Sequence, residues 1–236
     1  MNNVGDNILA GNTNWSFGGG VYKNFDAHIE SSIPFYLTGQ KIILQISDFF
    51  VLNDTLVYDI GCSTGTTLKE LATRHESKNV EYIGCDIENE MVKAAKQKCK
   101  NFKSISIVKD SISTLKLKKS NFIISYYTIQ FIHPNIRQGI FNNIYDSLNL
   151  GGSFIFFEKV RAPDARFQDI SNSVYNDYKL EKGYSAEQIL SKSKSLKGIL
   201  EPFTSEGNIE LANKAGFKNV SSIFKYYCFE GFLAIK

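Results

Sequence analysis

Short apolar runs alternate with amphipathic stretches along the middle of this 236-residue chain. The apolar runs are rich in Val, Ile, Phe and Tyr, which predicts strands that are buried on both faces. The stretches between them carry apolar residues at helical spacing and predict crossover helices. The predicted strands are 55–60, 80–86, 104–109, 122–127 and 153–158, and the predicted helices are 66–75, 90–100 and 135–148.

The flanking segments add further elements. Residues 26–50 predict helical structure before the core, and 164–197 predict a polar, tyrosine-containing helical region after it. The glycines within 149–152 predict the end of a helix before the fifth strand. Two closing strands are predicted at 220–230 and 232–235.

This order of elements resembles that of class I methyltransferases, an α/β, Rossmann-like fold. The resemblance implies a central, mostly parallel seven-stranded sheet with helices on both faces. It also implies that residues 1–50 form an N-terminal tail and helices that cover a cofactor. Residues 51–236 would then form the methyltransferase domain, with a helical lid inserted at about 164–202.

A loop of small residues follows the first predicted strand. Gly61, Ser63 and Gly65 leave room for a ligand to approach the backbone, and glycine permits unusual turn torsions. Asp86 ends the second strand, 21 residues after Gly65, where a carboxylate can bind both hydroxyls of a ribose. Asp110 ends the third strand, placed to reach an adenine amino group. Since open α/β sheets bind ligands at strand carboxyl ends, these residues predict an adenosine site; alternatively, they are solvated turn residues.

Asp59 distinguishes between possible cofactors. It lies two residues before Gly61, where it would repel a pyrophosphate but can bind the ammonium group of a methionine moiety. The loop also lacks the Lys-Ser/Thr pair that a phosphate-binding loop requires. The sequence therefore favours S-adenosylmethionine over a dinucleotide or a nucleoside triphosphate.

Several segments resemble the CmoA-like carboxy-S-adenosyl-L-methionine synthase family. The similar segments are 58–65, 25–36 with its Ser-Ile-Pro-Phe-Tyr, 127–131, 158–159, 183–185, 215–217 and 229–236. The resemblance implies a homodimer that joins the carboxyl of prephenate to the methyl carbon of S-adenosylmethionine, for modification of a tRNA wobble uridine. The cofactor contacts that it implies are Tyr36, Gly61, Cys62, Ser63, Asp86, Ile87, Asp110 and Ser111.

Two positions depart from the family pattern. Ser193 stands where a family arginine would bind the new carboxylate. Tyr126 stands where the family has an asparagine, and we predict that it still binds the cofactor. A serine hydroxyl cannot reproduce the two parallel hydrogen bonds of a guanidinium. Losing such a contact costs about 1.5–3 kcal/mol, although Lys192 and Lys194 flank the position as partial substitutes.

The departures favour a relative that transfers a methyl group from S-adenosylmethionine to a small molecule. Two alternatives stay open. The first is a carboxy-S-adenosyl-L-methionine synthase, in which carboxy-S-adenosyl-L-methionine occupies the site. The second is a non-catalytic dimeric protein that binds S-adenosylmethionine.

Three residues are predicted to act in catalysis. Tyr127 follows the fourth strand, where substrate meets cofactor, or it packs in the core. Glu158 ends the fifth strand and is either a general base or the ion-pair partner of Lys159 or Arg161. Tyr184 lies in the family-specific Gly-Tyr-Ser.

Other side chains carry weaker signals. Tyr175 and Tyr178 share a helical face, and with Tyr184 they either bind an aromatic or anionic substrate or form a dimer contact. His28 lies in the helix expected to cover the cofactor, and His133 is expected to be a loop or cap residue.

Composition limits the partners and the compartment. The formal net charge is only +3 and the lysines are scattered, which makes a nucleic-acid partner less expected than a metabolite. Three histidines without ligand spacing give no support for a metal site. Four cysteines without a C-x-x-C pair indicate reduced core residues and a cytoplasmic protein. Neither a signal-peptide pattern nor a membrane-spanning apolar stretch is visible.

Overall fold

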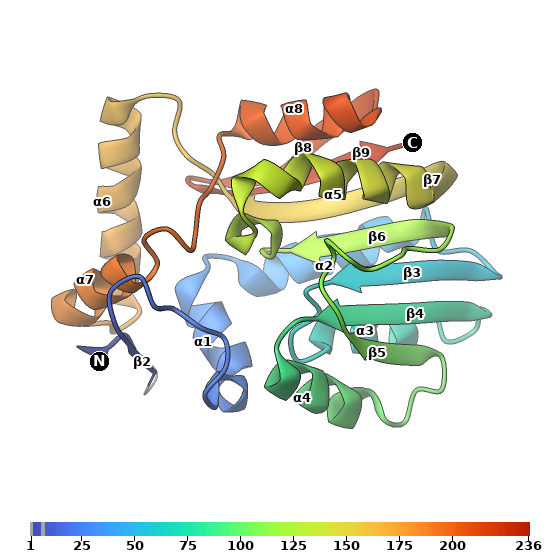
Figure 1. Cartoon of the computed structure of the whole chain (residues 1–236), viewed down its shortest axis with the longest axis horizontal. Coiled ribbons are helices and arrows are strands. Elements are labelled where there is room, and N and C mark those ends of the chain that lie inside the picture. The colour runs from blue at the N-terminus through green and yellow to red at the C-terminus, as the bar shows by residue number, and fades with distance from the viewer. Residues whose placement is uncertain (1, 6–7) are drawn as a thin grey trace.

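The computed structural model describes residues 2–5 and 8–236. Residues 1 and 6–7, which belong to the predicted N-terminal tail, lie outside the described residues. A seven-stranded sheet in the order β5-β4-β3-β6-β7-β9-β8 forms the centre of the molecule (Figure 1). Its strands are β3 (Thr55–Ile60), β4 (Val80–Asp86), β5 (Ile105–Lys109), β6 (Ser120–Tyr126), β7 (Leu148–Lys159), β8 (Asn219–Tyr226) and β9 (Phe229–Ile235).

The sheet is mixed. The first five of these strands, β3 to β7, are parallel neighbours, whereas β9 runs antiparallel to both β7 and β8. β3 pairs with β4 on one side and with β6 on the other, so the chain order reverses between β3 and β6. Open α/β sheets bind ligands at the carboxyl ends of their strands beside such a reversal. The predicted class of sheet is therefore confirmed, with its closing strand pair antiparallel.

Helices cover both faces of the sheet. On one face α2 (Tyr36–Ser47), α3 (Thr66–Arg74) and α4 (Asn89–Cys99) pack through residues such as Ile43 and Leu68. On the other face α5 (Pro134–Ser147) and α8 (Ser205–Ala215) pack through residues such as Phe141 and Leu211. Alternate residues of one strand serve the two faces, because side chains in a strand alternate in direction.

Three further helices gather beyond the sheet, at the left of Figure 1. They are α1 (Phe25–Ser32), α6 (Ala165–Glu181) and α7 (Ala186–Ser195). α6 begins at Asp164, whose carboxylate accepts the N–H of Phe167 over 3.0 Å. α7 begins with a capping box in which Ser185 and Gln188 satisfy each other's backbone N–H groups.

The N-terminal segment lies against this helical region. It contains a small two-stranded sheet of β1 (Asn2–Asn3) and β2 (Leu9–Ala10) and the short 3₁₀ helix η1 (Val21–Lys23). The N–H groups of Thr13 and Trp15 donate to the carbonyls of Lys194 and Ser195, over 3.0 and 3.2 Å. A second 3₁₀ helix, η2 (Ile129–Phe131), follows β6.

Several predicted boundaries were wrong. The helical stretch predicted over 26–50 divides into α1 and α2, because Pro34 cannot continue a helix and Phe35 takes a left-handed φ of 57°. The glycines of 149–152 lie within β7 rather than before it. The closing hairpin turns after Tyr226 and not at Gly231, which lies within β9. The glycine there makes room for the ring of Phe157, which occupies the space that a β-carbon would need.

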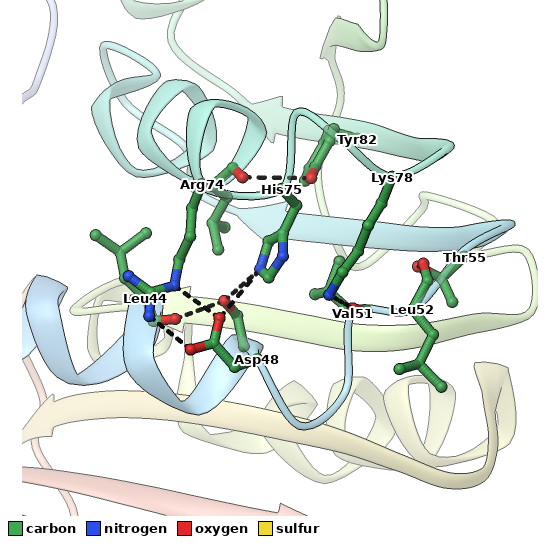
Figure 2. A network of polar contacts seen from close by, with 11 residues as sticks. Leu44, Asp48, Val51, Leu52, Thr55, Arg74, His75, Lys78 and Tyr82 are labelled. Carbon is green, nitrogen blue, oxygen red and sulfur yellow. Dashed lines mark hydrogen bonds and ion pairs between the residues drawn. The ribbon is translucent and has the colours of Figure 1, made fainter.

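A polar network joins the ends of α2 and α3, as Figure 2 shows. Arg74 donates through Nε to Asp48 Oδ1 over 2.7 Å and through its terminal nitrogen to Oδ2 over 2.5 Å. His75 is buried beside this pair, with its Nε2 2.7 Å from Ser47 Oγ. Burial lowers the pKa of His75, which favours the neutral ring. The network fixes one end of α2, whose other end carries Tyr36.

Candidate functional site

A cavity of about 820 Å³ opens at the carboxyl ends of the parallel strands. Its walls come from the loops after β3, β4, β5 and β6, from α1 and the start of α2, and from α6 and α7. Asp59, Asp86 and Asp110, which come from three successive strands, all line it. The convergence expected of these three carboxylates is present.

The loop after β3 turns through left-handed residues. Gly61, Ser63 and Gly65 have φ values of 73°, 49° and 80°. Gly61 also touches Thr128, since an added β-carbon would lie 2.3 Å from the Thr128 hydroxyl oxygen. Gly61, Cys62 and Ser63 line the cavity. Alanine or any larger residue at 61 would push the loop away from the segment that follows β6.

Gly65 has a different role from the one predicted. It does not line the cavity. Instead it begins α3 and faces α4, where an added β-carbon would lie 3.1 Å from Ala95 and from Cys99. Its small size therefore permits close packing of two helices, and a direct contact with a cofactor is not supported.

Asp59 and Asp86 form an acidic pair at the loop. Asp59 is buried, and that burial, with the charge of Asp86, raises its pKa to about 7. The Asp86 carboxylate accepts the N–H of Ser63 over 3.0 Å and the N–H of Glu88 over 2.9 Å. Burial raises the pKa of Asp86, and these backbone donors oppose the rise. A buried acidic pair of this kind favours a cationic ligand group.

The loop after β5 forms the next part of the wall. Asp110 Oδ1 accepts the N–H of Ser111 over 2.7 Å and the hydroxyl of Thr114 over 2.9 Å. Asp110 and Ser111 line the cavity together with Ile112 and the largely exposed Ile87. All of the residues predicted around an adenosine in this part of the chain thus face one space.

Three tyrosines form an aromatic wall beside the loop. Tyr36, Tyr126 and Tyr127 line the cavity. The ring centroid of Tyr126 lies 4.7 Å from that of Tyr36 and 4.8 Å from that of Tyr127. The Tyr126 hydroxyl donates to the carbonyl of Tyr36, so this departure from the family pattern ties β6 to α2. Tyr127 has a φ of 59°, a strained value for a residue of this size, and such strain concentrates at functional sites.

Glu158 lies behind the cavity wall. It is buried and does not line the cavity, and its carboxylate accepts the N–H of Ile129 over 3.1 Å. Burial raises its pKa to about 8, partly offset by the charge of Arg137. Among the described residues no ion pair joins it to Lys159 or Arg161, so that alternative was wrong. The position argues against Glu158 as a base that touches substrate.

The Gly-Tyr-Ser tyrosine reaches the cavity. Tyr184 is buried, lines the cavity, and has its hydroxyl 3.4 Å from Ser32 Oγ. His28 also lines it, with Nε2 in contact with Lys192 Nζ, and Lys192 lies 4.5 Å from the ring centre of Trp15. His28 thus faces the cavity, a placement that its sequence position alone did not predict.

Tyr178 and His133 lie away from the ligand space. Tyr175 and Tyr178 do stack, with centroids 6.3 Å apart, but only Tyr175 lines the cavity. His133 caps α5 by accepting the N–H of Asn135 over 3.3 Å, as expected of a cap residue.

Burial raises the pKa of the Cys62 thiol well above its usual value, which disfavours a nucleophilic thiolate.

The charges that line the cavity separate by origin. The carboxylates all come from residues 26–110, and the cationic ammonium and guanidinium groups all come from residues 159–197. The acidic set is Asp26, Glu30, Asp59, Glu70, Asp86, Glu88 and Asp110, and the basic set is Lys159, Arg161, Lys179, Lys192 and Lys197. The acidic set, here called the acidic side, suits a cationic ligand group, and the basic set, here called the basic side, suits an anionic one. The two sets meet at α1, where Lys192 Nζ donates to Ser32 Oγ over 3.4 Å.

The sequence predicted a ligand contact for Lys192 but not for the other cations of the basic set. Lys159 was predicted as one alternative partner of Glu158 and lies in the family-like segment 158–159, and Lys179 gave no signal except its spacing of four residues from Tyr175. Trp15, whose buried indole N–H has no partner among the described residues, was missed because it lies in an irregular segment. Ser193 lines the cavity and is exposed, whereas Lys194 does not line it.

The acidic side fits S-adenosylmethionine. The loop at 61–63 lets a ligand approach the backbone, Asp86 and Asp110 follow consecutive strands, and Asp59 is buried at the start of the loop. A sulfonium and an ammonium are both cations, which this side favours. Among the described residues no group of three or more potential metal ligands occurs, and none of the described helices is long and apolar enough to cross a bilayer.

Comparison with known proteins agrees with this chemistry. Residues 57–152 match a family model described as a methyltransferase domain. A carboxy-S-adenosyl-L-methionine synthase of Staphylococcus epidermidis is 37% identical over 94% of this chain and 97% of its own length. One of Nitratiruptor sp. is 38% identical over 90% of this chain and 89% of its own. The chain belongs to the carboxy-S-adenosyl-L-methionine synthase family.

This membership confirms the prediction of an S-adenosylmethionine-dependent transferase. Solved structures support the fold alone. Human N-acetylserotonin methyltransferase in complex with S-adenosylmethionine matches with a TM-score of 0.57 and 16% identity, over 94% of this chain and 60% of that one. The methyltransferase SibL matches with a TM-score of 0.64 and 13% identity, over 92% and 57%.

Proposed function

We propose that this protein is a carboxy-S-adenosyl-L-methionine synthase that uses prephenate as carboxyl donor. The division of charge within one cavity carries the proposal. A methyl-transfer site needs the acidic side for its cofactor, but the five cations from residues 159–197 call for an anionic second substrate. Prephenate is a dicarboxylate, and the relatives are named carboxy-S-adenosyl-L-methionine synthase.

The proposed reaction balances without a further reactant. S-adenosylmethionine, when bound, supplies a sulfonium methyl carbon that exchanges one hydrogen for the carboxyl carbon. The donor loses its bond to that carboxyl carbon and its ring hydroxyl, and becomes aromatic. The methyl proton and the lost hydroxide leave as water.

We assign the roles of individual residues as follows. Asp59 faces the methionine ammonium, Asp86 the ribose hydroxyls, and Asp110 with Ser111 the adenine. Tyr36 and Tyr126 hold the loop side of the space, while Tyr127 and Tyr184 orient the donor and exclude water from the reacting carbon. Glu158 acts as a positioning residue, since it fixes the backbone of Ile129 behind the wall.

Lys192 takes over the role of the family arginine, which Ser193 replaces in this chain. Its ammonium points to the cavity side of α7 and lies beside His28 and Trp15. An ammonium binds a carboxylate as a point charge, which is less directional than a guanidinium but retains the attraction. The serine departure is therefore compatible with a carboxylated cofactor.

Methyl transfer to a small molecule is the second candidate. The exposed Ser193 hydroxyl at the cavity wall favours it, because no planar fork is available there for a carboxylate. A cofactor-binding dimer without catalysis is the third candidate. We also propose that the protein works as a homodimer in the cytoplasm, with its four free cysteines reduced, and that its product serves the modification of a tRNA wobble uridine.

The ligand carried through purification distinguishes these candidates. Protein purified without added cofactor is denatured, and the released nucleosides are weighed by mass spectrometry. The proposal expects a species heavier than S-adenosylmethionine by one CO₂. Release of the demethylated product would favour methyl transfer, release of S-adenosylmethionine alone would favour the non-catalytic dimer, and no nucleoside at all would contradict all three candidates.

A further inference from the structure

Tyr175 of α6 is held in a fixed position at the basic side of the cavity. Its hydroxyl donates to the carbonyl of Ser32 over 2.7 Å, and its ring packs edge-on against Phe229 with centroids 5.2 Å apart. These contacts come from α1 and β9, so three separate elements determine where the ring lies.

Two lysines converge on this ring. The ammonium of Lys159, at the end of β7, lies 4.3 Å from the ring centre, and that of Lys179 in α6 lies 4.4 Å from it. Both lysines line the cavity. The backbone of Lys159 is itself fixed, since its N–H donates to Gln130 Oε1 over 2.6 Å.

Neither ammonium has a carboxylate partner among the described residues, whose ion pairs involve neither Lys159 nor Lys179. The thiol of Cys228 is close enough to influence both lysines, but burial raises its pKa and keeps it neutral. Burial lowers the pKa of Lys159, and burial with the charge of Lys159 lowers that of Lys179 to about 8. Two like charges held together in this way lack a counter-charge that an anion would supply.

We infer that Lys159, Lys179 and Tyr175 form a carboxylate subsite for the second substrate. It holds the carboxylate that is not transferred, and it adjoins Lys192 through Ser32, whose carbonyl accepts from Tyr175 and whose hydroxyl accepts from Lys192 over 3.4 Å. Asn172 and Asn176, which line the cavity from the same helix, add neutral donors beside it. The inference rests on the proposed function for the identity of the donor, but not for the binding of a carboxylate.

The test uses the full chain loaded with S-adenosylmethionine and titrated by calorimetry with prephenate and, separately, with malonate. The variants are Lys179→Gln and Lys159→Met. The matched control is Lys182→Gln, because Lys182 follows α6 and lies over Tyr178 at 5.5 Å but does not line the cavity. Unchanged affinity for S-adenosylmethionine shows that each variant is folded.

We expect Lys179→Gln and Lys159→Met each to weaken carboxylate binding about tenfold or more, and Lys182→Gln to leave it unchanged. In turnover the loss should raise KM for the donor more than it lowers kcat. Equal affinities in all four proteins, or no carboxylate binding by the unaltered protein, would overturn the inference. Lysine-dependent binding of malonate without any carboxylated product would support the subsite and reject the proposed reaction.

Discussion

The carboxylate of Asp86 accepts the backbone N–H of Ser63 over 3.0 Å, which joins the end of β4 to the loop after β3. Both residues line the cavity, so the bond shapes the surface that faces a ligand. Ser63 has a left-handed φ of 49°, and the carboxylate stabilises that conformation by accepting its N–H. The acid therefore does two things: it supports the loop and offers its remaining lone pairs to the cavity.

Replacing Asp86 with Asn should separate these two roles. The amide oxygen can still accept from Ser63, but the negative charge is lost, and affinity for S-adenosylmethionine should fall about tenfold or more. Calorimetry measures the affinity. Glu81→Gln, on an exposed position of the same strand, is the control. Equal affinity in the two variants would remove Asp86 from the proposed ribose contact.

Gly61→Ala should abolish tight cofactor binding, whereas Gly151→Ala should not. Both glycines have φ near 75°, so each alanine costs about 1–2 kcal/mol of backbone strain. Only at 61 would the new carbon meet Thr128, since nothing lies within 4 Å of the corresponding position at 151. Urea unfolding checks the shared loss of stability, and titration checks binding. Retained binding by the alanine variant at 61 would show that the loop tolerates displacement.

The Glu158 carboxyl should make stability depend on pH. Its native pKa of about 8 exceeds the ordinary glutamate value of 4.5, so the native state keeps a proton that the unfolded chain releases. The unaltered protein should therefore lose stability relative to Glu158→Gln as pH rises from about 4.5 to about 8, and not beyond. Urea unfolding of both proteins at several pH values measures the difference, in which the similar contribution of Asp59 cancels. A difference that stays constant across this range would mean that the native carboxyl is already ionised.

Lys98 should slow the release of the cofactor. Its ammonium contacts Asp26 Oδ2, Thr64 Oγ1 and Thr66 Oγ1 over 2.6–2.8 Å, which ties α1 to the loop at the cavity. Lys98→Met should raise the dissociation rate of S-adenosylmethionine a few-fold, because a partly exposed ion pair contributes little individually. Stopped-flow displacement measures the rate. Lys96→Met, exposed on the same helix, should match the unaltered protein, and a matching rate for Lys98→Met too would reject the role.

The sequence predicted the parallel core well because each strand is a short apolar run that can be recognised without knowledge of its neighbours. The runs over 55–60 and 80–86 match β3 and β4, since continuous apolar runs are needed wherever both faces are covered. The closing part of the chain was harder. α8 was not predicted, because its apolar residues are few and it packs through Leu211 and Ala212 against a helix far away in the sequence.

The candidate site also has a part that the sequence predicted and a part that it did not. The acidic side follows from position along the chain, since Asp59, Asp86 and Asp110 each sit at a strand end. The basic side does not, because Lys159 and Lys179 meet only when α6 folds back over the end of β7. At Gly65 the sequence pattern predicted a cofactor contact that the structure does not support. This glycine permits helix packing against Ala95, a neighbour that lies 30 residues later in the chain.

One labelling experiment tests the central claim most directly. The protein is incubated with S-adenosylmethionine and with prephenate that carries ¹³C in its ring carboxyl, and the nucleoside products are analysed by mass spectrometry. We predict a carboxylated nucleoside that contains the labelled carbon and fails to form when prephenate is omitted. A product without the label, or unchanged S-adenosylmethionine in a protein that binds both ligands, would contradict carboxyl transfer at this site.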